Sequence, residues 1–177
     1  IRRFNTLMGG VIPAYGDPET LSEVRRVFHY IKDTPTESGL YRPQVDFRAV
    51  SEPFQINELS FTPVVVEHGH RMTGYRIDGR NCSLGYVPDC CGMSQSAIAS
   101  FKGVELMILD ALRYRPHPQH FDIATSVEVL NQIGAKFSLL THICHDVDHA
   151  TLAGALPPHI QPAYDGLRLR LPLNQLK

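Results

Sequence analysis

The chain has 177 residues, of which 43% are hydrophobic and 20% are charged, and its formal net charge is -1 at pH 7. This composition is ordinary for a globular protein, and the length suits one domain better than two. The near-neutral charge argues against a strongly basic nucleic-acid groove. No apolar run approaches the ~18 residues of a transmembrane helix, and the opening residues IRRFN lack a signal peptide's apolar region.

The four cysteines form neither a Cys-x-x-Cys pair nor the framework of a secreted domain. We therefore expect reduced thiols in a cytoplasmic protein. The first residue is isoleucine rather than methionine. This predicts that the natural N-terminus lies upstream.

The first third of the chain predicts one strand and one helix. Residues 11–16 have the apolar pattern of a short buried strand. Asp17-Pro18 predicts the start of a helix, because Asp is a favoured N-cap and Pro is favoured at the first helical position. The apolar face of this helix would consist of Leu21, Val24, Val27, Phe28 and Ile31. Residues 32–43 are rich in Thr, Pro, Ser and Gly and predict a loop.

The middle of the chain predicts strands at residues 45–50, 59–67, 75–77 and 83–87. Asp78-Gly79 is a strong signal for a hairpin turn between the last two. Residues 94–101 predict a short helix.

From residue 104 onward the pattern alternates between strand and helix. Strands are predicted at residues 104–109 and 137–140, and helices from Asp122 and over 148–156. Val127, Leu130 and Ile133 share the apolar face of the first of these helices. Residues 161–171 predict a hairpin around Asp165-Gly166. A run of strands in the middle of the chain is thus followed by alternating strands and helices. This order predicts a single mixed α/β domain over residues 1–177, with helices covering a sheet.

Residues of the kinds that bind metals follow four of the predicted strands. They are His68, Asp89, the segment from Asp110 to His120, and the segment from His142 to His149. Clefts outside the ends of adjacent strands are where such sheets bind ligands. Each residue also has a structural interpretation by itself: His68 as a surface histidine, the two aspartates as turn caps. The four together predict a functional site.

These segments occur in the order VEHG, YVPDC, LDALRYRPHPQHF, LTHICHDVDH and AYDGL. As an ordered set they resemble the metallo-β-lactamase superfamily, and within it most nearly the PhnP-like phosphodiesterases of the phosphoribosyl cyclic-phosphate hydrolase type. tRNase Z is a more distant relative. The resemblance runs from about residue 11 to residue 171. It implies an α/β fold, the αββα sandwich of that superfamily.

The resemblance also implies metal ligands and a general acid. His68 corresponds to a ligand of the first metal, Asp89 to the carboxylate that bridges both metals, and His142 to a ligand of the second. Imidazole and carboxylate suit two divalent ions, Zn²⁺ or Mn²⁺, which would share a bridging hydroxide. His120 corresponds to the histidine that protonates the leaving oxygen, and Asp110 is a candidate to orient it.

Arg115 and His145 are candidates for binding the substrate, although Arg115 in a loop is also typical of plain surface charge.

The family's opening His-x-His-x-Asp-His motif does not occur in these 177 residues. We therefore expect that the N-terminal part of the domain is missing from the sequence. The three ligands left for two metals are few, because catalytic sites use about three protein ligands for each ion. This predicts incomplete metal binding and an inactive fragment of an enzyme that is active when intact.

The function expected is a two-metal phosphodiesterase that acts on a small cyclic or nucleotide phosphate. The alternatives are an RNA phosphodiesterase of tRNase Z type and a non-catalytic binding domain with the same fold. The near-neutral charge favours a small phosphorylated substrate over nucleic acid. We expect a homodimer, since a half-sandwich would expose an apolar sheet face, and no association with membranes.

Overall fold

The computed structural model describes residues 1–31 and 43–172. Nearly all of the loop predicted at 32–43 lies outside these residues. The chain divides into two compact units, Ile1–Glu52 and Pro53–Lys177, and a single domain over the whole chain stays a prediction. None of the described helices combines the length and the apolar character needed to cross a membrane.

The first unit contains α1 (Arg2–Met8), β1 (Ile12–Gly16), α2 (Pro18–Val27) and β2 (Val45–Ala49). The two strands pair in parallel. The predicted start of α2 is confirmed, because the Asp17 carboxylate accepts a hydrogen bond from the Glu19 N–H at 2.9 Å and Pro18 is the first helical residue. The helix ends at Val27, so Ile31 lies beyond it. Helix α1 was not predicted.

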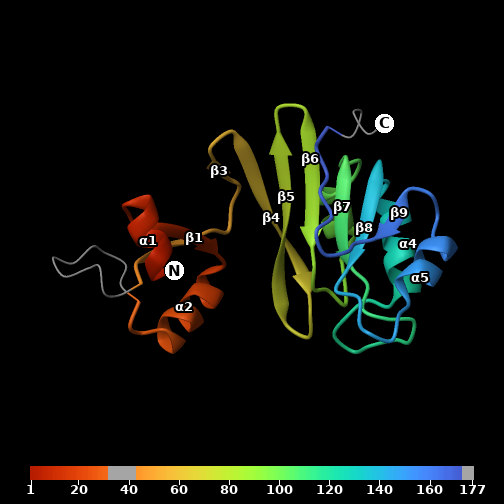
Figure 1. Ribbon diagram of the computed structural model, residues 1–177, viewed down its shortest axis with the longest axis horizontal. Helices are drawn as coiled ribbons and strands as arrows, with labels where there is room; N and C mark the ends of the chain where they lie inside the picture. Colours follow the sequence, from red (N-terminus) through yellow and green to blue (C-terminus); the bar gives the residue numbers. More distant parts are fainter. Residues whose placement is uncertain (32–42, 173–177) are drawn as a thin grey trace. The chain divides into compact units, whose positions relative to one another are not determined.

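The second unit is built on a seven-stranded sheet (Figure 1). Its strands lie in chain order: β3 (Phe54–Ile56), β4 (Leu59–Glu67), β5 (Arg71–Gly79), β6 (Cys82–Val87), β7 (Leu106–Asp110), β8 (Phe137–Thr141) and β9 (Ile160–Pro162). Pairing is antiparallel from β3 to β6 and parallel from β6 to β9. This is the predicted mixed α/β sheet, with β3 as an additional edge strand.

Two turn predictions were wrong in detail. Gly79 pairs with Cys82, so Arg80 and Asn81 form the loop between β5 and β6 rather than Asp78-Gly79. Asp165-Gly166 does lie in a turn, but no hairpin surrounds it, because β9 ends at Pro162 and pairs in parallel with β8.

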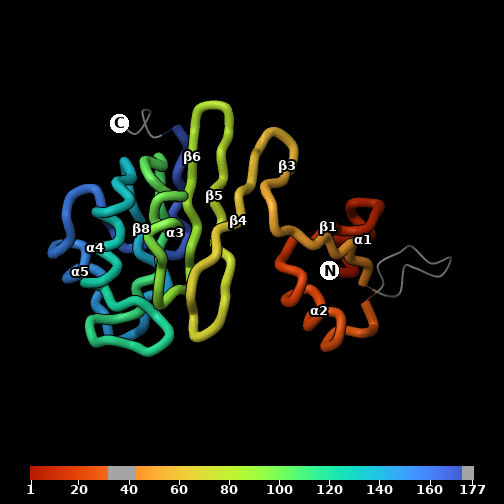
Figure 2. Tube along the Cα trace, turned by 180° about the vertical axis from the view of Figure 1, so that it is seen from behind, coloured from red at the N-terminus to blue at the C-terminus, as the bar shows by residue number. Residues whose placement is uncertain are grey.

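Three helices cover one face of this sheet, as Figure 2 shows from behind: α3 (Gln95–Ser100), α4 (Ile123–Ile133) and α5 (His149–Ala155). The predicted Asp122 cap is confirmed, since its carboxylate accepts a hydrogen bond from the Thr125 N–H at 2.8 Å. Buried side chains of the helices and strands form one core, which includes Val64, Phe101, Met107, Leu109, Leu130, Leu140 and Ile160.

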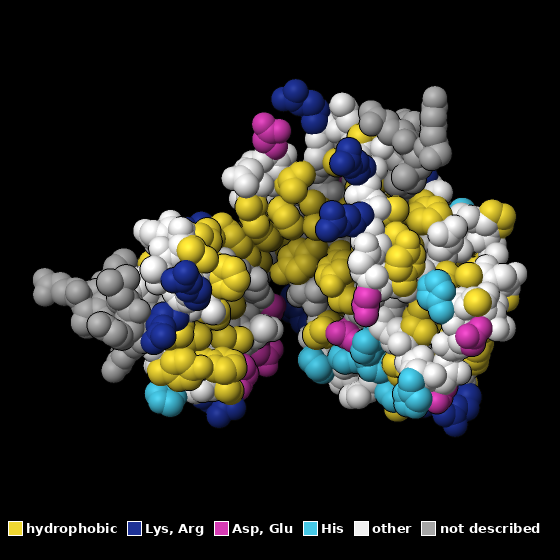
Figure 3. Space-filling view, in the orientation of Figure 1, with side chains coloured by type: hydrophobic (Ala, Val, Ile, Leu, Met, Phe, Trp, Pro, Cys, Tyr) yellow, Lys and Arg dark blue, Asp and Glu magenta, His cyan; other side chains and the backbone are white. Residues whose placement is uncertain are grey.

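The opposite face of the sheet is also apolar. The strand register aligns one residue from each of five strands in a row: Pro63, Tyr75, Tyr86, Ile108 and Leu139. Tyr86 in this row is 43% exposed, and Figure 3 shows apolar side chains over the same face. A sheet that is apolar on both faces is typical of the inner layer of a sandwich.

Candidate metal centre

The strand directions bring the predicted site residues to one edge of the sheet. Strand β4 is antiparallel to β5, which is antiparallel to β6, so β4 runs in the same direction as β6, β7 and β8. Their C-terminal ends therefore meet. His68 follows β4, Asp89 lies just beyond β6, Asp110 ends β7 and His142 follows β8. Histidine side chains gather along this lower edge in Figure 3.

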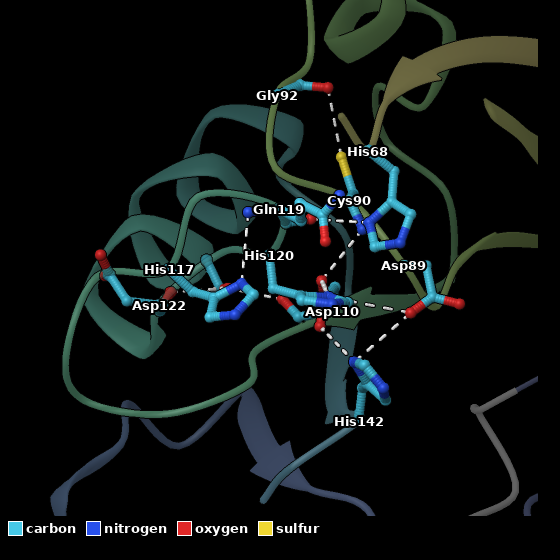
Figure 4. Close-up of polar contacts among 11 residues, drawn as sticks. His68, Asp89, Cys90, Gly92, Asp110, His117, Gln119, His120, Asp122 and His142 are labelled. Atoms are coloured by element: carbon cyan, nitrogen blue, oxygen red, sulfur yellow. Dashed lines mark hydrogen bonds and ion pairs between the residues drawn. The ribbon is translucent and has the colours of Figure 1, made fainter. Parts of the chain in front are cut away.

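Four of the side chains at this edge form a compact cluster of ligand atoms. Each of them places one nitrogen or oxygen atom within 4.8 Å of the ligand atoms of the others: Asp89, Asp110, His120 and His142. Figure 4 shows these side chains pointing toward one another. The imidazole rings of His120 and His142 have their centroids 4.6 Å apart. Two imidazoles and two carboxylates are a donor set that suits Zn²⁺ or Mn²⁺.

Asp110 is the fully buried member of this cluster and accepts hydrogen bonds from three N–H donors. Its Oδ2 accepts from the Cys90 backbone N–H at 2.9 Å and lies 2.9 Å from His120 Nδ1. Its Oδ1 lies 3.2 Å from His142 Nδ1. A carboxylate can only accept here, so both imidazoles carry their proton on Nδ1 and leave Nε2 for other chemistry. Asp110 is therefore placed to orient the two rings, with its oxygens already engaged.

Asp89 is more accessible than Asp110. Its side chain is 36% exposed, and its Oδ1 lies 3.4 Å from His142 Nδ1 and 3.8 Å from His120 Nδ1. This partly open carboxylate has oxygen atoms available at the surface of the cluster, as a metal ligand requires.

His142 has a left-handed backbone conformation, with φ at +63°. Such a conformation is uncommon outside glycine and clusters at functional sites. The residue follows directly on β8, and its 42% exposed side chain turns toward Asp110 and Asp89. No sequence pattern signals this local strain.

The loop that carries His120 is fixed at its base. Leu112 N–H donates to the Phe121 carbonyl at 2.9 Å, and Phe121 N–H donates to the Cys90 carbonyl at 2.7 Å. Between these bonds, Arg113 donates to the carbonyls of Arg115 and Pro116. The Arg113 guanidinium thus stabilises the loop from within. His120 is thereby held over Asp110.

His68 lies beside the four-residue cluster rather than within it. Its ring centroid is 4.5 Å from that of His120, and its Nδ1 contacts the Gln119 carbonyl at 2.6 Å. Gly69 follows with φ at +68°, and a Cβ there would lie 2.8 Å from the Gln119 side chain. The left-handed backbone conformation of the turn after β4 therefore favours glycine at position 69. The ligand role of His68 stays a prediction.

Other polar groups surround the centre less closely. Arg115 and His145 both contact Asp146, at 3.4 Å and 3.2 Å, and their side chains are 74% and 95% exposed. Their role in substrate binding stays a prediction. The ring of His117 lies 5.0 Å from that of His120. Desolvation and the nearby Arg113 guanidinium lower the pKa of His117.

A cleft that the sequence did not predict adjoins the centre. It has a volume of about 350 Å³ and is lined by Thr141, His142, Ile143, Ala163, Tyr164 and Asp165. His142 thus belongs both to the cluster and to the cleft. The lining residues come from two segments that the sequence analysis singled out, LTHICHDVDH and AYDGL, but neither pattern indicated a cleft.

The family model of the beta-lactamase superfamily domain matches residues 1–143. The chain belongs to the β-lactamase superfamily. A crystal structure of a diphosphatase from the PhnP family matches it with a TM-score of 0.81 and 31% sequence identity, over 94% of this chain and 61% of that chain. The resemblance read from the five sequence segments is therefore confirmed.

More distant structures share the fold. Zn²⁺-bound PqqB from Methylobacterium extorquens matches with a TM-score of 0.69 and 20% identity, over 92% of this chain and 66% of that one. The short form of human tRNase Z matches with a TM-score of 0.61 and 12% identity, over 92% of this chain and 68% of that one. At these identities the likeness shows the metallo-β-lactamase fold alone.

One curated protein is also related. An octanoyltransferase from Porphyromonas gingivalis is 28% identical over 159 residues, which make up 88% of this chain and 32% of that protein. The chain thus spans about a third of this relative and about three fifths of the PhnP-family diphosphatase.

Proposed function

We propose that the whole protein is a metal-dependent hydrolase, and more specifically a two-metal phosphodiesterase that acts on a small cyclic or nucleotide phosphate. The observation that carries this proposal is the cluster of Asp89, Asp110, His120 and His142 at the ends of neighbouring strands. The 31% identity to a diphosphatase of the PhnP family supports phosphate chemistry at this position. The near-neutral net charge favours a small substrate over RNA.

The residues present fit divalent metal ions. Asp89 and His142 would hold them, with His68 as a third ligand from the turn after β4. Bound ions of this kind activate water at neutral pH and neutralise the negative charge that develops on a phosphoryl group. Asp110 is placed behind the ligands, where its contact with His142 Nδ1 directs the other ring nitrogen, Nε2, outward.

His120 would supply the proton that the leaving oxygen needs. Asp110 accepts the Nδ1 proton at 2.9 Å, so Nε2 is the nitrogen that faces a reacting group. When the ring is protonated, Nε2 can donate its proton while the buried carboxylate stabilises the imidazolium. The two prolines at 116 and 118 restrict the loop that carries this ring.

Metal titration of the chain tests the first part of the proposal. Isothermal titration with Zn²⁺ should show binding that His142→Ala abolishes, and elemental analysis of the purified proteins should agree. His159→Ala is the matched control, since His159 is an exposed histidine away from the cluster. Equal binding by both variants would contradict the site. Metal binding without any hydrolysis of phosphodiesters by the whole protein would favour the non-catalytic binding domain.

A further inference from the structure

The segment after β9 forms a wall of the 350 Å³ cleft beside His142. Sites for small organic ligands have volumes of about 300–1,000 Å³, so the cleft is within their range. His142 lines the cleft and also contacts Asp89 and Asp110 in the cluster. A substrate whose phosphate lies at the metal centre would therefore place its adjoining group in this cleft.

Tyr164 is the aromatic residue among those that line the cleft. Its side chain is 59% exposed, although the backbone around it is fixed. Ala163 N–H donates to the Leu140 carbonyl at 2.8 Å, and Leu167 N–H closes a turn on the Tyr164 carbonyl at 3.1 Å. The turn includes Gly166, with φ at +87°. The ring of His149 packs edge-on against Tyr164 at 5.9 Å. The tyrosine is thus both positioned and open to a ligand.

Asp165 gives the same wall a negative charge. It is exposed and forms no salt bridge with any residue that the structure describes. An ionised carboxylate accepts hydrogen bonds but cannot donate them. It therefore favours hydroxyl or amino groups in the cleft and repels a second phosphate.

We propose that this cleft binds the nucleoside part of the substrate, which makes the substrate a nucleoside phosphodiester rather than a sugar that carries a further phosphate. Tyr164 stacks on the base, and Asp165 accepts hydrogen bonds from the ribose hydroxyls or from an amino group of the base. This inference rests on the proposed function, because the metal centre must hold the phosphate for the cleft to receive the nucleoside.

Isothermal titration of the Zn²⁺-loaded whole protein with adenosine monophosphate and with ribose 5-phosphate tests the proposal. Stacking on an aromatic side chain should make adenosine monophosphate bind about 10-fold more tightly. Tyr164→Ala should remove this preference and Tyr164→Phe should keep it. Tyr114→Ala is the control, since Tyr114 is an exposed tyrosine that does not line the cleft. Equal affinities in the wild type, or an unchanged preference in Tyr164→Ala, would overturn the proposal.

The charge of Asp165 is tested separately. Asp165→Asn should weaken the binding of adenosine monophosphate and strengthen that of ribose 1,5-bisphosphate, which carries a phosphate at each end. The opposite change would overturn the role given to this carboxylate.

Hydrolysis of bis(4-nitrophenyl) phosphate by the whole protein separates this inference from the proposed function, because that substrate has no nucleoside. Metal-dependent hydrolysis without a preference for adenosine monophosphate would overturn the inference alone. Absence of both metal binding and hydrolysis would overturn the proposed function, and the inference with it.

Discussion

The buried carboxylate of Asp110 accepts the Nδ1 proton of His120 at 2.9 Å. Its second oxygen contacts His142 Nδ1 at 3.2 Å. One side chain at the end of β7 thus sets the tautomer of both the candidate acid and a candidate ligand. A change at Asp110 should therefore affect two functions that the sequence assigns to separate residues.

Asp110→Asn should weaken metal binding by about 10- to 100-fold, the usual effect of losing a carboxylate behind a metal-bound histidine. In this variant, the oxygen of the Asn side chain accepts hydrogen bonds from the Cys90 N–H and from the Nδ1 proton of His120. The NH₂ group of the same amide therefore faces His142. That donor favours the tautomer of His142 with its proton on Nε2, which cannot bind a metal through Nε2. Zn²⁺ titration measures the change. Unchanged affinity would show that Asp110 does not orient His142.

His120→Ala should lower kcat of the whole protein by about 10²- to 10⁴-fold, the range for general acid–base groups, while metal content stays at the wild-type level. His142→Ala should lose metal. A bis-aryl phosphodiester with a good leaving group needs little protonation, so it should partly restore the activity of His120→Ala and not that of His142→Ala. Elemental analysis with kinetics on two leaving groups measures both. Equal metal loss in the two variants would make His120 a ligand rather than the acid.

Cys90 should be the unreactive thiol of the four. Burial raises its pKa from 9.0 to about 12, and the thiolate is the reactive form. Titration with a thiol reagent at pH 8 should count three accessible cysteines in the folded chain and four after unfolding. Cys90→Ala should leave the folded count at three. Folding raises the pKa of this thiol, so the folded state favours its protonated form. The free energy of unfolding should therefore keep its full value below pH 9 and fall as the pH rises from 9 toward about 12.

Asp122→Ala should lower the free energy of unfolding by about 1 kcal/mol, the typical effect of removing an N-cap. The change removes the 2.8 Å hydrogen bond to the Thr125 N–H at the start of α4. Asp122→Asn keeps an acceptor at this position and should cost much less. Urea denaturation of the three proteins measures the difference. An equal loss in both variants would mean that the charge of Asp122, rather than its capping bond, stabilises the helix.

The sequence predicted the position of the site because four candidate residues end or follow apolar strands: His68, Asp89, Asp110 and His142. Parallel alignment of β6, β7 and β8 then brings Asp89, Asp110 and His142 together. The helix caps at Asp17 and Asp122 were predicted from neighbouring residues alone, and both were confirmed.

What the sequence could not predict depends on tertiary pairing. The segment around Asp165-Gly166 has a correct turn signal, but whether β9 pairs with β8 or folds back on itself is decided by contacts with distant residues. The left-handed conformation of His142 and the double role of Asp110 also arise from packing. For the same reason the cleft beside Tyr164 has no signature in the sequence.

The common direction of β4, β6, β7 and β8 has a consequence for the order of folding. The candidate ligands after these strands are far apart in the chain and meet only when the parallel strands have paired, which requires slow, long-range loop closure. A metal ion would therefore find no preformed site in the unfolded chain and would bind only the folded one. By mass action, a bound metal would then stabilise the native sheet, so the free energy of unfolding should rise with the concentration of the metal.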